Sequence, residues 1–291
     1  MFADATGVAI NEFQRRRGLH TSGECDEETW LALVEAGWRL GDRLLLLSAP
    51  MQRGDDVAAL QEALNRVGFD CGRPDGIMGP ATGRALADFQ RNSGLTPDSI
   101  CGPHTVKMIE LVSRQSGSGP GVASVRELEA AATYTPLESL RIVVGQFGGL
   151  SSITRSLART LRDDGATVIS TDEYEATAHA AAANRFGASV YLGFEAVTDR
   201  RAIISYFAVP TFESVGGRAL ADRMLRHLEP AIDVEPTLRG MRLPVLRETR
   251  MPAVLCSLGP VRSVVDHADA ITEAVTAAVR SWTALPMVDQ G

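Results

Sequence analysis

The feature that most limits the fold is a repeat within the first 114 residues. FQRRRGL at 13–19 returns as FQRNSGL at 89–95, an offset of 76 residues. At the same offset Thr6 matches Thr82, Gly7 matches Gly83, Ala9 matches Ala85, Cys25 matches Cys101 and Thr29 matches Thr105. A repeat of this length predicts two copies of one small structural unit.

The second copy reads as three short helices. GDDVAALQEALNRVGF (54–69) places apolar residues three or four apart, which predicts one buried helix face. The turn PDGIMGP (74–80) follows, and a last helix begins after Gly102-Pro103. The first copy starts only at the equivalent of position 78. We therefore expect that Met1 is not the natural start, and that any signal peptide would be missing with the absent piece.

The rest of the chain alternates predicted strands and helices after a Gly/Ser/Pro-rich linker. Strands are predicted at 141–145, 166–170, 188–193, 202–209 and 253–258. Helices are predicted between the first two strands and at 175–186, 214–229 and 266–282. We expect an α/β domain with a mixed, mostly parallel central sheet flanked by helices, beside small all-α three-helix repeats. The predicted division is 1–48 (truncated repeat), 49–114 (complete repeat), 115–139 (linker), 140–284 (α/β domain) and 285–291 (tail).

Charge and cysteine content exclude several classes of function. The net charge of −7 opposes nucleic-acid binding, which needs a dense basic face. The four cysteines form no CxxC pair, so neither a disulfide framework nor a zinc knuckle is indicated. No apolar run approaches the roughly 18 residues of a membrane helix. Reduced thiols and the lack of a visible signal favour the cytoplasm, but the incomplete N-terminus leaves the location open.

The second copy resembles the peptidoglycan-binding domain found on many bacterial cell-wall hydrolases. The positions that carry the resemblance are Gly54, Val57, Leu60, Gln61, Leu64, Gly68, Phe69, Asp75, Gly76, Gly79, Thr82, Phe89, Gln90, Gly94, Leu95, Gly102 and Thr105. Peptidoglycan or a muropeptide precursor is therefore the expected ligand. Asp75, Gly76, Gly79 and Gln90 are its predicted contacts, although turn chemistry explains the first three about as well.

The C-terminal unit resembles the zinc-dependent N-acetylmuramoyl-L-alanine amidases. The stretches that carry this resemblance are RIVVGQFGG (141–149), AANRFGASVYLGFEA (182–196), ISYF (204–207) and RMPAVLCSLG (250–259). Members of the family hold zinc with two histidines and a glutamate, and use a further glutamate as general base.

Matching these groups residue by residue leaves one carboxylate. Gly148 stands at the first histidine position, Glu195 at the second, and Ser257 at the base, while the loop that carries the metal-binding glutamate is missing after Gly149. The resemblance therefore implies no metal, no cofactor and no catalytic residue. Glu195 is predicted as a ligand contact, with a plain polar strand-end residue as the alternative.

Other residues have simpler interpretations. Glu175 and His179 share a helix face and could chelate a metal, but an exposed polar pair is favoured. Cys256 is expected to be a buried structural thiol. GQFGGLSS (145–152) lacks the spacing of a phosphate loop, and Ser151 or Ser152 is expected to cap the next helix.

The sequence thus predicts a non-catalytic protein of bacterial cell-wall metabolism that binds peptidoglycan or its precursor. A regulatory contact with a cell-wall synthesis protein is a further expected partnership. The alternative is an active amidase with an unrecognised metal arrangement around Glu195, and a third hypothesis is an intracellular regulator that never meets the mature wall.

Overall fold

The computed structural model describes residues 2–115, 121–132 and 135–284. The predicted tail (285–291) and parts of the predicted linker (116–120 and 133–134) lie outside the described residues. The chain divides into two compact units between Arg126 and Glu127.

The first unit is helical. Its helices are α1 (Phe2–Arg17), α2 (Glu27–Ala36), α3 (Asp55–Arg66), α4 (Pro80–Asn92) and α5 (Pro103–Gln115), and α6 (Val122–Ala132) crosses the boundary between the units. Pro80 and Pro103 open their helices at a position where the missing N–H costs nothing. Leu60, Phe89 and Ile109, from α3, α4 and α5, pack into one buried cluster. None of the described helices is long and apolar enough to span a membrane.

The second unit contains seven strands and the helices between them. In chain order its elements are η1 (Leu137–Ser139), β1 (Arg141–Phe147), α7 (Ser151–Asp163), β2 (Thr167–Thr171), α8 (Ala176–Phe186), β3 (Val190–Ala196), β4 (Ala202–Val209), β5 (Phe212–Glu213), α9 (Val215–Leu228), η2 (Glu229–Ala231), β6 (Pro236–Met241), α10 (Pro244–Glu248), β7 (Ala253–Leu258), α11 (Val261–Asp266) and α12 (Ala268–Ala284).

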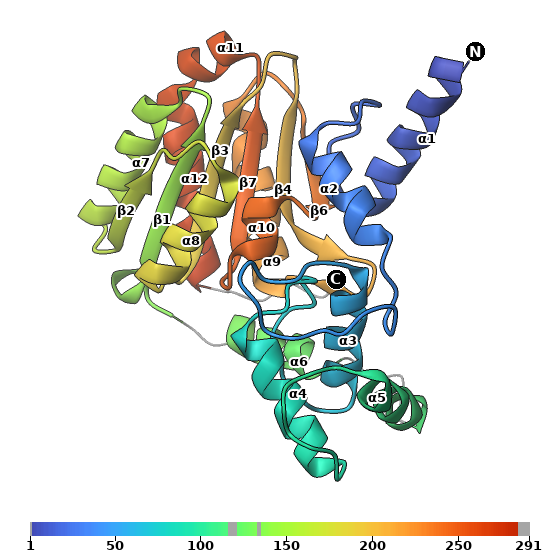
Figure 1. The fold of residues 1–291 in the computed structure, drawn as a ribbon. Helices are drawn as coiled ribbons and strands as arrows, with labels where there is room; N and C mark the ends of the chain where they lie inside the picture. Colours follow the sequence, from blue (N-terminus) through green and yellow to red (C-terminus); the bar gives the residue numbers. More distant parts are fainter. Residues whose placement is uncertain (1, 116–120, 133–134, 285–291) are drawn as a thin grey trace. The chain divides into compact units, whose positions relative to one another are not determined.

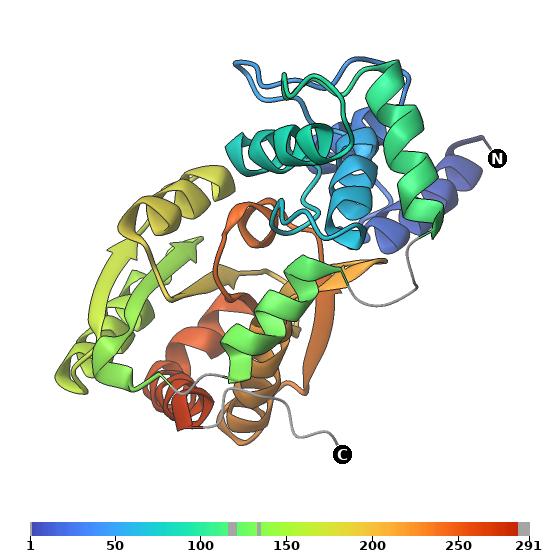
Figure 2. The ribbon, with the colours of Figure 1, turned by 90° about the horizontal axis from the view of Figure 1, so that it is seen from below.

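The sheet is mixed, as the sequence predicts. Its order is β2-β1-β3-β7-β4-β5, with β6 also paired to β4. The pairs β1–β2, β1–β3, β3–β7 and β4–β6 are parallel, whereas β4 runs antiparallel to β7 and to β5. Helices cover both faces of this sheet: α7, α9 and α12 lie on one side and α8 and α10 on the other (Figures 1 and 2).

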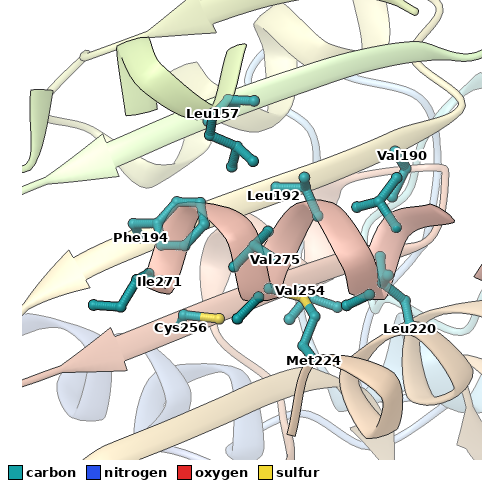
Figure 3. Close-up of a cluster of buried hydrophobic side chains, with 14 of the residues drawn as sticks. Leu157, Val190, Leu192, Phe194, Leu220, Met224, Val254, Cys256, Ile271 and Val275 are labelled. Atoms are coloured by element: carbon teal, nitrogen blue, oxygen red, sulfur yellow. The ribbon is translucent and has the colours of Figure 1, made fainter. Parts of the chain in front are cut away.

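The larger core of this unit lies under α7, α9 and α12. Strand residues such as Leu192 and Val254 meet Leu157 of α7, Leu220 of α9 and Val275 of α12 (Figure 3). All of these side chains are fully buried. Because every second residue of β3 and β7 points into this core, the residues between them point to the opposite face of the sheet.

Two strands were not predicted from the sequence. β6 reads PTLRGM and has four residues between its buried ends that are partly or fully exposed, so it lacks the apolar alternation of a strand with one buried face. β5 has only two residues and pairs with the end of β4. The predicted helix at 266–282 corresponds to α12, which begins and ends two residues later, and the short helix α11 before it was not predicted.

Candidate strand-end site

Two positions singled out in the sequence, Glu195 and Ser257, lie side by side at the carboxyl ends of parallel strands. The register aligns Phe147 of β1 with Glu195 of β3, and Glu195 with Ser257 of β7. The carboxyl ends of the strands are where α/β proteins commonly assemble their sites. The structure thus brings together the positions that the amidase resemblance assigns to a histidine and to the general base.

Glu195 and Ser257 form a hydrogen-bonded pair. The Ser257 hydroxyl donates to Glu195 Oε2 over 2.6 Å. Ser257 is fully buried and Glu195 is half-buried, so the hydroxyl fixes a carboxylate that still reaches solvent. The carboxylate of such a pair can accept hydrogen bonds from a bound molecule, or it can serve as one ligand of a metal ion.

Cys256, next to this pair, has no part in it. Its side chain points into the opposite core, where it is completely buried, and burial raises the pKa of its thiol to about 12. A thiol with this pKa is not a nucleophile at neutral pH. This burial agrees with the structural thiol expected from the sequence.

The glycine turn after β1 is capped by a side chain that the sequence did not single out. Gln146 Oε1 accepts hydrogen bonds from the backbone N–H groups of Gly149 at 3.0 Å and Leu150 at 2.9 Å. The expectation that Ser151 or Ser152 caps α7 is wrong, because Leu150 is the N-cap residue and no side chain caps it. Gln146 instead satisfies N–H groups of the turn that leads into the helix.

Gly148 is required in this turn. Its φ is +84°, and a Cβ atom there would lie 3.1 Å from the Cβ of Ala196. The turn therefore runs directly over the end of β3. A histidine side chain at this position would need the backbone to change conformation.

His179 is buried, and the exposed polar pair expected from Glu175 and His179 is wrong. The Nε2 atom lies 2.7 Å from the carbonyl oxygen of Glu173, and Nδ1 lies 2.8 Å from the hydroxyl of Tyr191. Since a carbonyl only accepts, the ring is protonated at Nε2 and the tyrosine donates to Nδ1. Burial lowers the pKa of His179, and Phe147 stacks on the ring at 4.3 Å.

The strand ends do not fit the family's set of zinc ligands. Across residues 2–115, 121–132 and 135–284, no three His, Cys, Asp or Glu side chains are close enough together to share a metal ion. Glu195 has Ser257 and Phe147 as its register neighbours, and neither offers an ordinary metal ligand.

The predicted contacts of the helical unit fall into two groups. Asp75, Gly76 and Gly79 lie in one loop, and Gln61 of α3 organises it: Gln61 Nε2 donates to Asp75 Oδ1 at 2.8 Å, while Gln61 Oε1 accepts from the Gly76 N–H at 2.8 Å. Gly76 is buried, whereas Asp75 and Gly79 are half-buried. The sequence did not assign this role to Gln61.

Gln90 belongs to the second group, because it serves another turn. It is 2% exposed, and its amide donates to Asp98 Oδ1 at 2.8 Å and to the Ile100 carbonyl at 3.0 Å. Its Oε1 accepts from the Ser99 N–H at 3.0 Å. Both ends of the side chain are used inside the protein, which indicates a structural role.

Comparison with known proteins identifies both units. The domain family described as "Putative peptidoglycan binding domain" matches residues 53–109. This supports the resemblance of this segment to a peptidoglycan-binding domain, while the bounds 49–114 and the further copy at 1–48 stay predictions. N-acetylmuramoyl-L-alanine amidase CwlM of Mycobacterium tuberculosis is 32% identical over 315 aligned positions, which cover 94% of this chain and 77% of CwlM.

Solved amidase structures also match the chain. The catalytic domain of CwlV from Bacillus (Paenibacillus) polymyxa matches with 16% identity and a TM-score of 0.39, over 50% of this chain and 99% of that one. Ami1 from Mycobacterium smegmatis matches with 12% identity and a TM-score of 0.43, over 52% and 99%.

These findings correct one prediction from the sequence. The expectation that the chain is not an enzyme is contradicted, because the relative that aligns with almost its full length is named an amidase. By this identity and coverage, the chain belongs to the N-acetylmuramoyl-L-alanine amidase family that includes CwlM.

Proposed function

We propose that the chain acts in bacterial cell-wall metabolism by recognising peptidoglycan or a muropeptide precursor through its helical unit. The observation that carries the proposal is the peptidoglycan-binding match over residues 53–109. Membership of the CwlM family supports the cell wall as the setting. Contact with a cell-wall synthesis protein stays a prediction.

We place the contact surface beside Gly79. A Cβ atom on Gly79 would lie 3.9 Å from Met51 Sδ, and one on Gly83 would lie 2.9 Å from Leu47 Cδ1. Met51 and Leu47 are 44% and 45% exposed. Exposed apolar side chains next to a small residue suit the flat faces of sugar rings and the methyl groups of alanine. Asp75 and Gly76 shape the adjoining loop, and contact through Gln90, whose amide is bonded to the turn at 98–100, stays a prediction.

Hydrolysis of the muramoyl–L-alanine amide is the second candidate function. The amidase name of the 32% identical relative favours it. In this case Glu195 is the carboxylate at the strand end that would take part, and Ser257 holds it in place through the 2.6 Å hydrogen bond. The metal arrangement would then differ from two histidines and one glutamate.

A sedimentation experiment tests recognition of peptidoglycan. Purified chain is mixed with isolated sacculi, and the fraction that sediments with them is measured for wild type, Met51→Glu and the control Leu111→Glu. Leu111 is also exposed but lies on α5. We expect wild type and the control to sediment and Met51→Glu to stay in solution. Failure of wild type to bind either sacculi or soluble muropeptides would refute recognition.

Amide hydrolysis is tested separately on the same preparation. Muropeptides are incubated with the chain, free L-alanyl peptide is measured by mass spectrometry, and metal content is determined by elemental analysis. Cleavage that is lost in Glu195→Gln, with stoichiometric zinc in wild type, supports the second candidate. Absence of cleavage by the metal-loaded chain counts against it.

A further inference from the structure

Helix α2 presents a broad apolar face to solvent. Trp30, Leu31, Leu33 and Val34 are 61%, 55%, 39% and 48% exposed. These positions fall on one side of the helix, because residues three and four apart are neighbours on its surface. The opposite side, with Thr29, Ala32 and Glu35, is buried.

The pair α1–α2 is built like the pair α4–α5. In each pair a glutamine of the first helix spans the connecting turn and reaches a threonine of the second. Gln14 Nε2 donates to Thr29 Oγ1 at 2.9 Å, and Gln90 Nε2 donates to Thr105 Oγ1 at 3.3 Å. The glutamine Oε1 accepts a backbone N–H from the turn in both cases. The matching residues, each 76 positions apart, are Gln14 and Gln90, Gly23 and Ser99, and Thr29 and Thr105.

The two pairs differ in how they are covered: α3 packs against α4–α5, whereas the apolar face of α2 is exposed. Ile109 of α5 is fully buried in a cluster with Leu60 and Leu64 of α3. Leu33, the equivalent of Ile109 at the same offset, is 39% exposed. Trp30 is the equivalent of Val106, which packs against the same cluster. Core positions of one pair are thus surface positions of the other.

We propose that the apolar face of α2 is a docking surface for a partner's amphipathic helix of the α3 type. Such a helix carries apolar residues at the spacing of Val57, Leu60 and Leu64, which cover Ile109 in the complete pair. It packs across Trp30 and Leu33 and completes a three-helix arrangement. The proposal is independent of peptidoglycan binding.

The size of the surface favours a single helix over a second copy of the chain. The four exposed side chains offer roughly a few hundred Å² of apolar surface, near the upper end of what monomers expose. A stable protein–protein interface needs about 800 Å² from each partner. One helix needs far less, and the apolar face of α3 shows how it fits.

The sequence of α3 in this chain provides the peptide for the test. A fluorescein-labelled peptide with the sequence of residues 54–69 is titrated with the full chain, and fluorescence polarisation is measured. Leu33→Asp places a charge in the middle of the proposed docking surface. Leu111→Asp makes the same change at an exposed leucine of α5 and is the matched control. A second peptide with Leu60→Asp and Leu64→Asp lacks the apolar stripe. Circular dichroism checks that both protein variants keep their helices.

We expect saturable binding of the first peptide and none of the second. Leu33→Asp should weaken binding at least about tenfold, because a carboxylate would be buried in apolar contact. Leu111→Asp should stay within about twofold of wild type, as is usual for surface changes. Absence of saturable binding, or equal binding by Leu33→Asp, overturns the proposal. Concentration-dependent dimers that Leu33→Asp abolishes would overturn it too, since a second copy would then be the occupant.

Discussion

Replacing Gln61 by methionine tests whether the glutamine supports the loop of the peptidoglycan-binding domain. Methionine has a similar length and volume but no amide, so little cavity is created. The Gly76 N–H loses its acceptor at 2.8 Å, while the Ile77 carbonyl and Thr82 Oγ1 lose a donor at 3.1 and 3.0 Å. All three residues are buried. Each of these hydrogen bonds contributes about 1 kcal/mol, so we expect a loss of about 3 kcal/mol.

Urea unfolding followed by tryptophan fluorescence measures this loss. In a Trp282→Phe background the signal comes from Trp30 and Trp38, which are both in the helical unit. With a urea dependence of about 1–2 kcal/mol per molar, the midpoint should fall by roughly 1.5–3 M. The control is Arg66→Met, an exposed position on the same helix, which should change stability by less than about 0.5 kcal/mol. If Gln61→Met is as stable as this control, the amide does not support the loop.

Three further predictions concern the α/β unit and the thiols. Ser257→Ala should lower the free energy of unfolding of that unit by about 1 kcal/mol, since the 2.6 Å bond to Glu195 is lost; equal urea midpoints would contradict this. His179 has a pKa lowered by burial, so below its ordinary value of 6.5 the unfolded chain binds a proton that the folded chain does not. Stability should therefore fall from pH 7 to pH 5, and less steeply in His179→Gln; parallel pH curves would exclude His179 as the cause. A thiol reagent at pH 8 should modify one cysteine of the native chain quickly, and Cys25→Ser should abolish this fast phase, because Cys25 is exposed. The buried thiols, each with a pKa raised to about 12, are Cys71, Cys101 and Cys256.

Apolar periodicity was enough to predict most of the α/β unit. β7 has its predicted bounds, whereas β3 begins two residues and ends three residues later than predicted. β6 was missed because its sequence has no alternation of apolar and polar residues, although its backbone pairs with β4. Backbone pairing of this kind depends on a partner strand far away in the sequence, and local pattern does not reveal it.

The polar side chains of the site were harder to predict. On an amphipathic helix, Gln61 and Gln90 look like residues of the solvated face, yet each is buried against a turn. The recurring distance from Gln14 and Gln90 to a threonine 15 residues later was the available signal. The burial of His179 depends on Gly145, where a Cβ atom would lie 2.5 Å from the Nδ1 atom of the ring. No spacing rule links these two residues.

The antiparallel placement of β4 determines how a molecule can reach Glu195. β4 begins beside the end of β7, so the segment that connects β3 to β4 passes along this end of the sheet. A Cβ atom on Gly259, the residue after β7, would lie 2.4 Å from the Val197 carbonyl of that segment. The main chain therefore closes the side of the Glu195 site next to Gly259. On the opposite flank, a Cβ atom on Gly149 would have no neighbour within 4 Å. A molecule that approaches Glu195 therefore meets closely packed backbone on the side of Gly259 and open space at Gly149.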